Sequence, residues 1–367
     1  TALFMRRIIS LLSLLCCILC AGAQDNGGGS SEKKSYIHML HTNVTRFDEK
    51  INPDAWILVG DVQFRRDSMY MYCDSAHYFQ KKNAFQAFGN VRMVQGDTLS
   101  LTGDVLYYNG LDKLARVRNN VVLVHGETTL YTDSLDYDRL YNVGYFFEGG
   151  HLVTQDNDMT SDWGEYRPET KMAVFNYNVH MVTPAPPQQA RTTLLSDTLY
   201  YNTVTSVANV RGPSTIDDGG CHIYTEFGYM DSNNNNLTLL KRSEMSNNGK
   251  KLIGDSIVWN SVDSIGEAFG NILYTDILSN NAMTGNYCYY NDKLGYTLGT
   301  DSACIMDFSQ GADTLYMHAD SIKMFTFNVN TDSAYRTMHA YNHVRMYRTD
   351  MQGVCDSLVY QTRDSMM

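Results

Sequence analysis

The chain has 367 residues and a formal net charge of −11 at pH 7, with 40 acidic side chains against 29 lysines and arginines. Because phosphate binding needs a basic surface, this balance argues against a nucleic-acid partner. Beyond the N-terminus, no stretch is long and apolar enough to predict a transmembrane helix.

Residues 1–23 have the pattern of a cleavable secretory signal peptide. The pattern consists of a basic pair, an apolar stretch and a small-residue cleavage site: Arg6-Arg7, Ile8–Leu19 and Ala21-Gly22-Ala23. We therefore expect export, followed by a flexible leader rich in glycine and serine over residues 24–35. A lipid anchor on Cys20 is the less favoured alternative, because Leu19 before it fits that signal poorly.

The most informative feature is a motif in which an acidic or amide residue is followed, four positions later, by a large apolar side chain. The instances are Asp74/Tyr78, Asp104/Tyr108, Asp133/Tyr137, Asp162/Tyr166, Asp197/Tyr201, Glu226/Met230, Asp255/Trp259, Asn286/Tyr290, Asp320/Met324 and Asp356/Tyr360. A spacing near 30 residues, sustained along the chain, indicates one supersecondary unit stacked on copies of itself.

Each repeat is predicted to be a β-hairpin. In the best-formed unit, the extended runs Thr98–Asn109 and Lys113–Gly126 are joined by a turn that begins with Asn109-Gly110. Tyr, Val, Thr and Leu dominate these runs, and no helical periodicity is present. The prediction is an all-β fold, an elongated antiparallel β-jelly-roll or solenoid of about ten two-strand repeats.

Twelve-residue strands are longer than usual, so we expect them to bend across two packed sheets. Gly103, Gly164 and Gly228 are candidate corners. A second landmark, a polar pair before an apolar residue, predicts a bulge or tight bend. It occurs at Gly60-Asp61-Val62, Gly89-Asn90-Val91, Asn119-Asn120-Val121, Tyr177-Asn178-Val179, Gly270-Asn271-Ile272 and Asn342-His343-Val344.

The repeats are divided by a proline-rich loop. We expect repeats over residues 36–183, the loop over 184–191, and further repeats over 192–367, in one continuous stack or two. The last strand motif is followed by the end of the sequence, before a partner strand, which is the pattern expected of a fragment.

Strand alternation predicts which side chains share a face. Asp133, Leu135 and Tyr137, at positions 0, +2 and +4 of one motif, are expected to point the same way. Positions +1 and +3 include apolar pairs such as Val105 and Tyr107, so that face is not purely solvated. We expect it to pack against a neighbouring sheet; the alternative is that it binds something apolar.

No catalytic or metal-binding constellation stands out. His339 and His343 lie four residues apart, but no HExxH motif or cysteine pair accompanies them, so a structural role is favoured. Ten copies of the motif carboxylate indicate a ladder rather than one catalytic pair. We therefore expect no enzymatic activity, no cofactor and no metal.

The strand-entry landmark, the Asp-x-Leu-x-Tyr strand and the 30-residue spacing together resemble the OstA-like family of lipopolysaccharide-transport proteins. The segments GNVRMVQGDTLSLTGDVLYYN and NNVVLVHGETTLYTDSLDYD carry the pattern most clearly. The resemblance implies a V-shaped β-jelly-roll in the periplasm whose apolar interior shields the acyl chains of lipopolysaccharide. It also implies an inner-membrane export adaptor and outer-membrane translocon components as partners, and edge-to-edge self-association.

Candidate lipid-groove residues follow from this resemblance and lie on the motif strands and their apolar strand entries. They are Leu106, Tyr108, Val121, Leu123, Leu135, Tyr137, Val179, Leu199, Tyr201, Ile257 and Trp259. Each acyl CH2 kept from water is worth about 0.8 kcal/mol, so an apolar groove needs no catalytic group. The pattern does not separate a groove from a closed core, nor a free-standing bridge from a translocon arm.

Two other function classes stay open from the residues alone. A structural or adhesive secreted β-repeat protein without lipid cargo predicts a closed, fully packed interior. A carbohydrate-active β-helix enzyme predicts a cleft with clustered carboxylates of shifted pKa, and parallel coils rather than hairpins. The Asn-Gly turns speak against parallel coils.

Overall fold

A computed structural model describes residues 35–183, 191–278, 280–291, 293–308, 313–328 and 335–361. The chain divides into two units, Thr1–Tyr36 and Ile37–Met367. The predicted signal peptide and almost all of the predicted leader lie outside the described residues. All secondary structure in the described residues belongs to the second unit, and none of it is a helix long and apolar enough to cross a membrane.

In its described part, the second unit consists of 23 strands and one short 3-10 turn, η1 (Gln80–Lys82). The strands are β1 (His38–His41), β2 (Val44–Arg46), β3 (Trp56–Arg66), β4 (Met69–Phe79), β5 (Ala84–Gln95), β6 (Leu99–Asn109), β7 (Leu114–His125), β8 (Thr128–Asp138), β9 (Val143–Val153), β10 (Asp158–Ser161), β11 (Trp163–Arg167), β12 (Met172–Thr183), β13 (Thr192–Asn202), β14 (Val207–Asp218), β15 (Cys221–Asp231), β16 (Asn236–Asn247), β17 (Lys250–Asn260), β18 (Ile265–Asp276), β19 (Asn281–Asn291), β20 (Tyr296–Asp307), β21 (Leu315–Phe327), β22 (Tyr335–Arg348) and β23 (Met351–Gln361).

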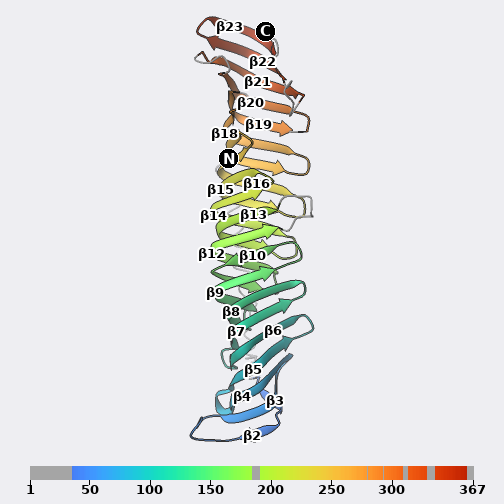
Figure 1. The fold of residues 1–367 in the computed structure, drawn as a ribbon, viewed down its shortest axis with the longest axis vertical. Coiled ribbons are helices and arrows are strands. Elements are labelled where there is room, and N and C mark those ends of the chain that lie inside the picture. Colours follow the sequence, from blue (N-terminus) through green and yellow to red (C-terminus); the bar gives the residue numbers. More distant parts are fainter. Residues whose placement is uncertain are drawn as a thin grey trace, which may run out of the picture. The chain divides into compact units, whose positions relative to one another are not determined.

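Antiparallel pairing follows chain order, so each hairpin lies directly on the one before it (Figure 1). The short strands β1 and β2 both pair with β3, and β10 and β11 both pair with β9 and β12, so each short pair takes the place of one strand. The prediction of an all-β, elongated antiparallel jelly-roll of sequential strands is confirmed.

The sheet continues across the proline-rich region. β12 and β13 pair along their whole length, from Met172 opposite Asn202 to Thr183 opposite Thr192. The strands on both sides therefore belong to one ladder. Residues 184–190 themselves are outside the described part of the chain.

The sheet bends near the middle of its long strands, where β3, β5, β7, β9, β12, β18, β20 and β22 each have two successive residues in the left-handed region. In β5, Gly89 and Asn90 have φ of +71° and +44°, and the register with β6 shifts there. Glycine and asparagine tolerate this conformation best. The same pair of positive φ values occurs at all six predicted bends, which confirms that prediction: at 60–61, 89–90, 119–120, 177–178, 270–271 and 342–343.

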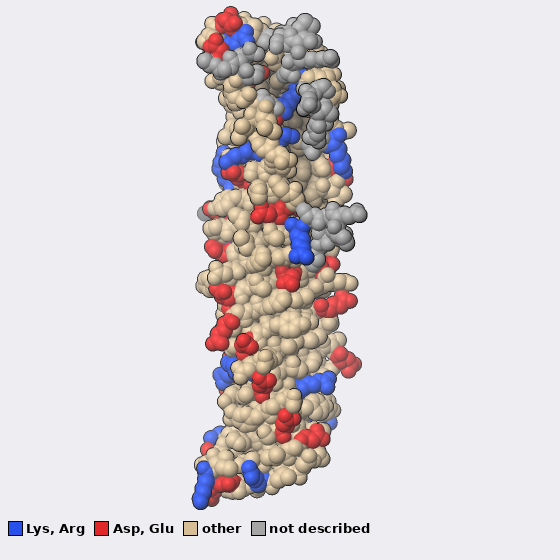
Figure 2. Space-filling model, viewed as in Figure 1, with Lys and Arg blue, Asp and Glu red and all other residues tan. Residues whose placement is uncertain are grey.

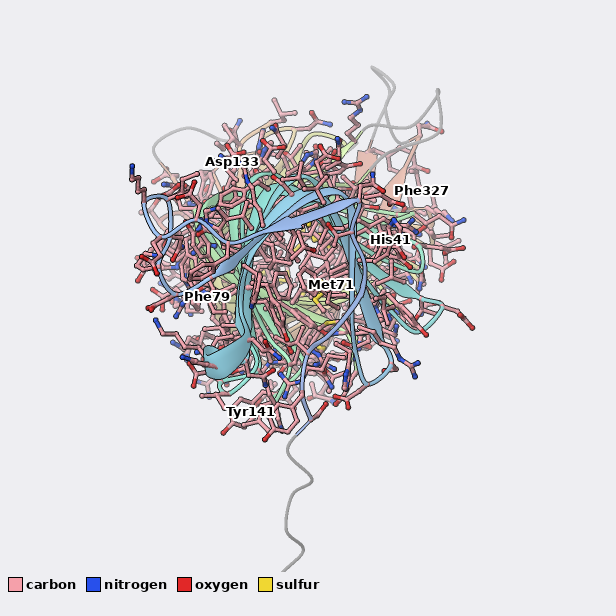
Figure 3. The ribbon with its side chains drawn as sticks, turned by 90° about the horizontal axis from the view of Figure 1, so that it is seen from below. His41, Met71, Phe79, Asp133, Tyr141 and Phe327 are labelled. Carbon is pink, nitrogen blue, oxygen red and sulfur yellow. The ribbon has the colours of Figure 1, made fainter. Side chains whose placement is uncertain are left out.

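The bend divides the sheet into two arms that face each other. The part of the sheet that contains Leu99–Gly103 of β6 is called the first arm, and the part that contains Val105–Asn109 is called the second arm. Across the gap, Phe64 of the first arm stacks on Phe85 of the second, with ring centroids 4.4 Å apart. Figure 3 looks along the stack, with Asp133 on the side of the bends, Tyr141 on the opposite side and Met71 between them.

Glycine keeps the arms close beside the bend. A Cβ atom on Gly103 would lie 2.5 Å from Cγ1 of Val117, which belongs to the second arm. Gly103 pairs regularly with Val91, so it is a point of close approach next to the bend. The predicted corner is therefore displaced by a residue or two, because the left-handed pair on the neighbouring strand makes the bend.

Two expectations about the strand faces are wrong. Asp133 is exposed, whereas Leu135 and Tyr137 are buried, because alternation is interrupted at the bend where the aspartate lies. The face that carries positions +1 and +3 is also not covered by a neighbouring sheet. Tyr107 is 45% exposed and Tyr229 is 37% exposed on this outer face.

Candidate functional site

The interior between the arms is the principal candidate site, and it contains all the sequence-predicted groove residues. Ten of them are at most 1% exposed: Leu106, Tyr108, Val121, Leu123, Leu135, Tyr137, Val179, Leu199, Tyr201 and Ile257. The eleventh, Trp259, is half-buried and packs against the same core. The structure therefore brings residues from β6 to β17 onto one continuous apolar inner surface.

Side chains fill this interior. The buried set extends from Ile37 to Tyr360 and belongs to one cluster, in which large aromatic and aliphatic groups from both arms are in contact. Over the first repeats, Phe64, Phe85 and Tyr108 make successive ring contacts of 4.4 and 5.5 Å. In this state the two arms enclose a packed core.

Opposite the bends, the hairpin turns of the two arms meet along a line that we call the mouth. Four motif tyrosines reach across it. The phenol of Tyr108 accepts a hydrogen bond from Nη1 of Arg66 (2.8 Å), and that of Tyr78 donates to the carbonyl of Ile37 (3.0 Å). The other two bridges join His125 Nδ1 to Tyr166 Oη (3.0 Å) and Asn157 Nδ2 to Tyr201 Oη (2.7 Å).

Burial makes these phenols reliable hydrogen-bonding groups. It raises the pKa of Tyr78 and of Tyr166 above the ordinary value, and it raises the pKa of Tyr137, on the same inner face, to about 12. These three side chains therefore stay neutral at physiological pH and keep their hydroxyl protons. The terminal position of the motif thus combines an apolar ring in the core with a polar group at the mouth.

Residues 34–189 match a family model described as OstA-like protein. Over these residues, the chain is similar to the OstA-like family. The family resemblance predicted from the motifs is confirmed. No curated protein matches the sequence.

Solved structures that resemble this chain include LptH from Pseudomonas aeruginosa, described as the LptA-homologous periplasmic component of the conserved lipopolysaccharide transport device. The two sequences are 12% identical, the match covers 39% of this chain and 82% of LptH, and the TM-score is 0.24.

The acidic residues of the motif stabilise the bends. Asn90, Asn120, Asn178 and Asn271 each donate a side-chain hydrogen bond of 2.6–2.8 Å to the motif aspartate sixteen residues earlier. At a later bend, His343 takes the place of the asparagine, and its Nδ1 lies 2.9 Å from Asp320 Oδ2. This position gives His343 the structural role that the sequence favoured.

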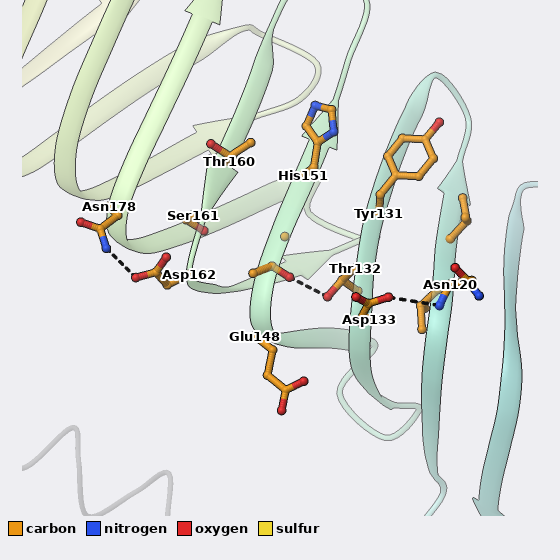
Figure 4. Close-up of a pocket in the computed structure, with 14 residues that line it drawn as sticks. Asn120, Tyr131, Thr132, Asp133, Glu148, His151, Thr160, Ser161, Asp162 and Asn178 are labelled. Atoms are coloured by element: carbon orange, nitrogen blue, oxygen red, sulfur yellow. Dashed lines mark hydrogen bonds between the residues drawn. The ribbon is translucent and has the colours of Figure 1, made fainter.

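A shallow hollow of about 560 Å³ lies on the outer side of these bends (Figure 4). Tyr131 and His151 stand at one end of it, while Asp133 and Asp162 lie at the other with their asparagine partners. In the described residues, no group of three or more His, Cys, Asp or Glu side chains is arranged to hold a metal ion. On the face shown in Figure 2, acidic and basic side chains are interspersed.

Sequence reasoning missed the partners across the mouth. Arg66, His125 and Asn157 each contact a tyrosine 41 to 44 residues later. Since the repeat is near 30 residues, these pairs do not fall on one repeat length. The only local signal is a polar residue at the end of a first-arm strand or in the turn that follows it.

Proposed function

We propose that this OstA-like protein carries lipopolysaccharide, or a related glycolipid, through the periplasm with its acyl chains held between the two arms. The family implies a non-catalytic role in lipopolysaccharide transport. The observation that supports a lipid cargo is the continuous apolar inner surface, to which β3 through β23 all contribute. A long acyl chain needs a surface of this kind, because each CH2 withdrawn from water contributes about 0.8 kcal/mol.

Cargo requires the arms to separate locally, since side chains fill the interior in the closed state. In the described part of the chain, side-chain packing and the bridges at the mouth hold the arms together on that side, whereas the backbone ladder runs along each arm. Separation over one or two repeats would leave the ladder intact. The acyl chain then covers the apolar inner surface that the separation of the arms exposes.

We further propose an inner-membrane export adaptor and outer-membrane translocon components as partners, with self-association through strand edges. In the described residues, β23 pairs with β22 alone, so its other side presents an edge. Export by the predicted signal peptide places the protein in the periplasm under this proposal.

A structural or adhesive role without cargo is the second candidate, and a specific observation favours it. The inner surface is closed over most of its length, with Leu106, Leu135 and Leu199 fully buried. That is the packing this alternative predicts, so the experiment must distinguish a core that stays closed from one that opens for lipid.

In-cell photocrosslinking separates the two functions. A photoreactive phenylalanine analogue replaces Tyr108, which points inward, or Tyr107, which is 45% exposed on the outer face of the same strand. Lipopolysaccharide adducts at position 108 and not at 107 are the expected result. If the folded, exported protein gives no adduct at 108 or at the inward position 137, the structural role replaces the proposed one.

A further inference from the structure

The mouth is not bridged evenly along the chain. Tyrosine bridges hold it from Ile37 to Tyr201, and Ser206 Oγ also donates to Asp156 Oδ2 at 2.9 Å. Farther along, Lys250 Nζ lies 5.9 Å from the ring centroid of Tyr290, and Arg336 Nη2 lies 2.6 Å from Asp276 Oδ2. Between the Ser206 and Lys250 contacts, the described residues form no hydrogen bond or ion pair between the arms.

The sequence explains this gap. At the position four residues after the motif acid, where the first five motifs carry tyrosine, the next two carry Met230 and Trp259. Neither side chain has a phenol hydroxyl to reach the opposite turn. The interruption therefore covers two successive repeats.

A cavity of about 50 Å³ opens at this interruption, and both arms line it. The first arm contributes Ile216, Ile223 and Asp218, and the second contributes Met230, Leu237 and Trp259 among others. On this measure of volume one water molecule needs about 10–15 Å³, so the space suits a slender chain and is too small for a folded partner.

Some core side chains behind the cavity are more exposed than the motif leucines of the first repeats. Leu237 and Met245 are each 7% exposed, whereas Leu106 and Leu135 are completely buried. Leu252, on β17, is only partly buried although it packs against the core. The inner surface next to the cavity is therefore already partly accessible to solvent.

We propose that this part of the mouth, between Asp218 and Trp259, is the port through which a single acyl chain passes between solvent and the interior. The inference rests on the proposed function and adds a location to it. Aliphatic side chains and one indole supply the apolar part of the port's lining, as an alkyl chain requires, beside polar residues such as Asp218 and Asn235. The buried Oγ of Ser232, which also lines the cavity, has no hydrogen-bond partner among the described residues and suits the carbonyl at the head of an acyl chain.

An acyl chain fits the port better than a peptide does. A bound strand needs free backbone groups to pair with. At the port, the N–H groups of Ser232 and Ser261 already donate to the carbonyls of Ser206 and Asn235, both at 3.2 Å. The port thus offers apolar side chains and one buried hydroxyl without a partner, that of Ser232, while these two backbone N–H groups are already paired.

Tryptophan quenching in the purified full chain tests the port. The chain has three tryptophans, so Trp56→Phe with Trp163→Phe leaves Trp259 as the reporter. A stearate that carries a nitroxide near its methyl end is mixed with this protein, and quenching of Trp259 is followed in time. Met230→Arg places a charge in the port, while Tyr229→Arg places the same charge on the outer face of β15.

We expect quenching of Trp259 in the parent protein, a rate about tenfold lower for Met230→Arg because the charge opposes passage of an apolar chain, and an unchanged rate for Tyr229→Arg. Far-UV circular dichroism confirms folding, and Met230→Gln, a milder change, should slow quenching in the same direction. Equal rates in the parent and both Met230 variants overturn the port and leave lipid binding intact. A parent protein that takes up no stearate overturns the port together with the proposed function.

Discussion

The side-chain amide of Asn120 donates a hydrogen bond of 2.8 Å to Oδ2 of Asp104, across the bend between neighbouring strands. Asn120 is in the left-handed region with φ of +51°, and its own N–H lies 3.2 Å from Oδ1 of Asp133. One asparagine therefore joins the aspartates of two successive motifs. This relationship explains why the motif begins with an acidic residue although that residue is not in the core.

Replacement of Asn120 should loosen this bend. Asn120→Ala loses the side-chain hydrogen bond to Asp104 and places a Cβ without a polar group in the left-handed region, for a combined cost of about 2 kcal/mol. Asn120→Gly loses the side-chain bond alone and should cost about 1 kcal/mol. Hydrogen exchange of the amides in Leu99–His125 measures the local opening free energy, and protection equal to wild type in both variants would contradict this role.

Tyr108→Phe should open the mouth at one repeat. The variant keeps the buried ring and removes the hydroxyl that accepts hydrogen bonds from Arg66 and Arg139. Arg66 is 3% exposed, so a buried guanidinium group loses a partner, at a cost of about 1–3 kcal/mol in local opening. Hydrogen exchange at the turn from Arg66 to Met69 is the measurement. Tyr107→Phe on the outer face is the control and should leave that turn unchanged.

The repeat, its strands and its bends could be predicted from the sequence because each depends on contacts between neighbouring strands. Tyr, Val and Leu at alternate positions predict the strands, and a pair such as Gly89-Asn90 predicts the bend. The inward direction of Tyr108 and Tyr137 also follows from alternation, once the strand half is known.

The face of the strand on which Asp133 lies, and the residue pairs that join across the mouth, could not be predicted in the same way. The bend inserts left-handed residues that interrupt alternation, so a strict two-residue period places the aspartate on the wrong face. The pairing of Arg66 with Tyr108 depends on how far one arm is offset against the other. That offset is set by packing of the whole inner surface, and no local pattern encodes it.

Acid should weaken the bridge at His125. Burial and the neighbouring ammonium of Lys171 lower the pKa of His125 below its ordinary value of 6.5. The folded state therefore binds fewer protons than the unfolded state in this window, so stability rises with pH. The contribution of neutral His125 to the stability of the folded state is complete above the pKa of the unfolded state. It is lost as pH falls through 6.5 toward the lower pKa of the folded state.

Histidine side-chain NMR titration checks this prediction, together with hydrogen exchange of the turn from His125 to Thr128 at pH 7.5 and pH 5.5. Lys171→Met removes one of the two causes and should move the His125 pKa back toward its ordinary value. A His125 titration at or above the ordinary value in the parent protein would rule out the acid-sensitive bridge.

Two inward-facing cysteines report directly on whether the arms separate. Burial raises the pKa of Cys73 and of Cys288 to about 12, from an ordinary value of 9.0. Since the thiolate is the reactive form, iodoacetamide at pH 8 should modify them about a thousandfold more slowly than in the urea-unfolded chain. Mass spectrometry of timed samples measures both rates.

The effect of added lipid on these alkylation rates distinguishes a lipid carrier from a structural protein. If acyl chains enter between the arms, added lipopolysaccharide moves the neighbouring side chains, and the alkylation rate of Cys73 or Cys288 should change while the protein stays folded. A cargo-free structural protein keeps both rates constant at every lipid concentration. Because the readout lies inside the core and needs no substitution, it distinguishes an opening interior from a permanently closed one in the native chain.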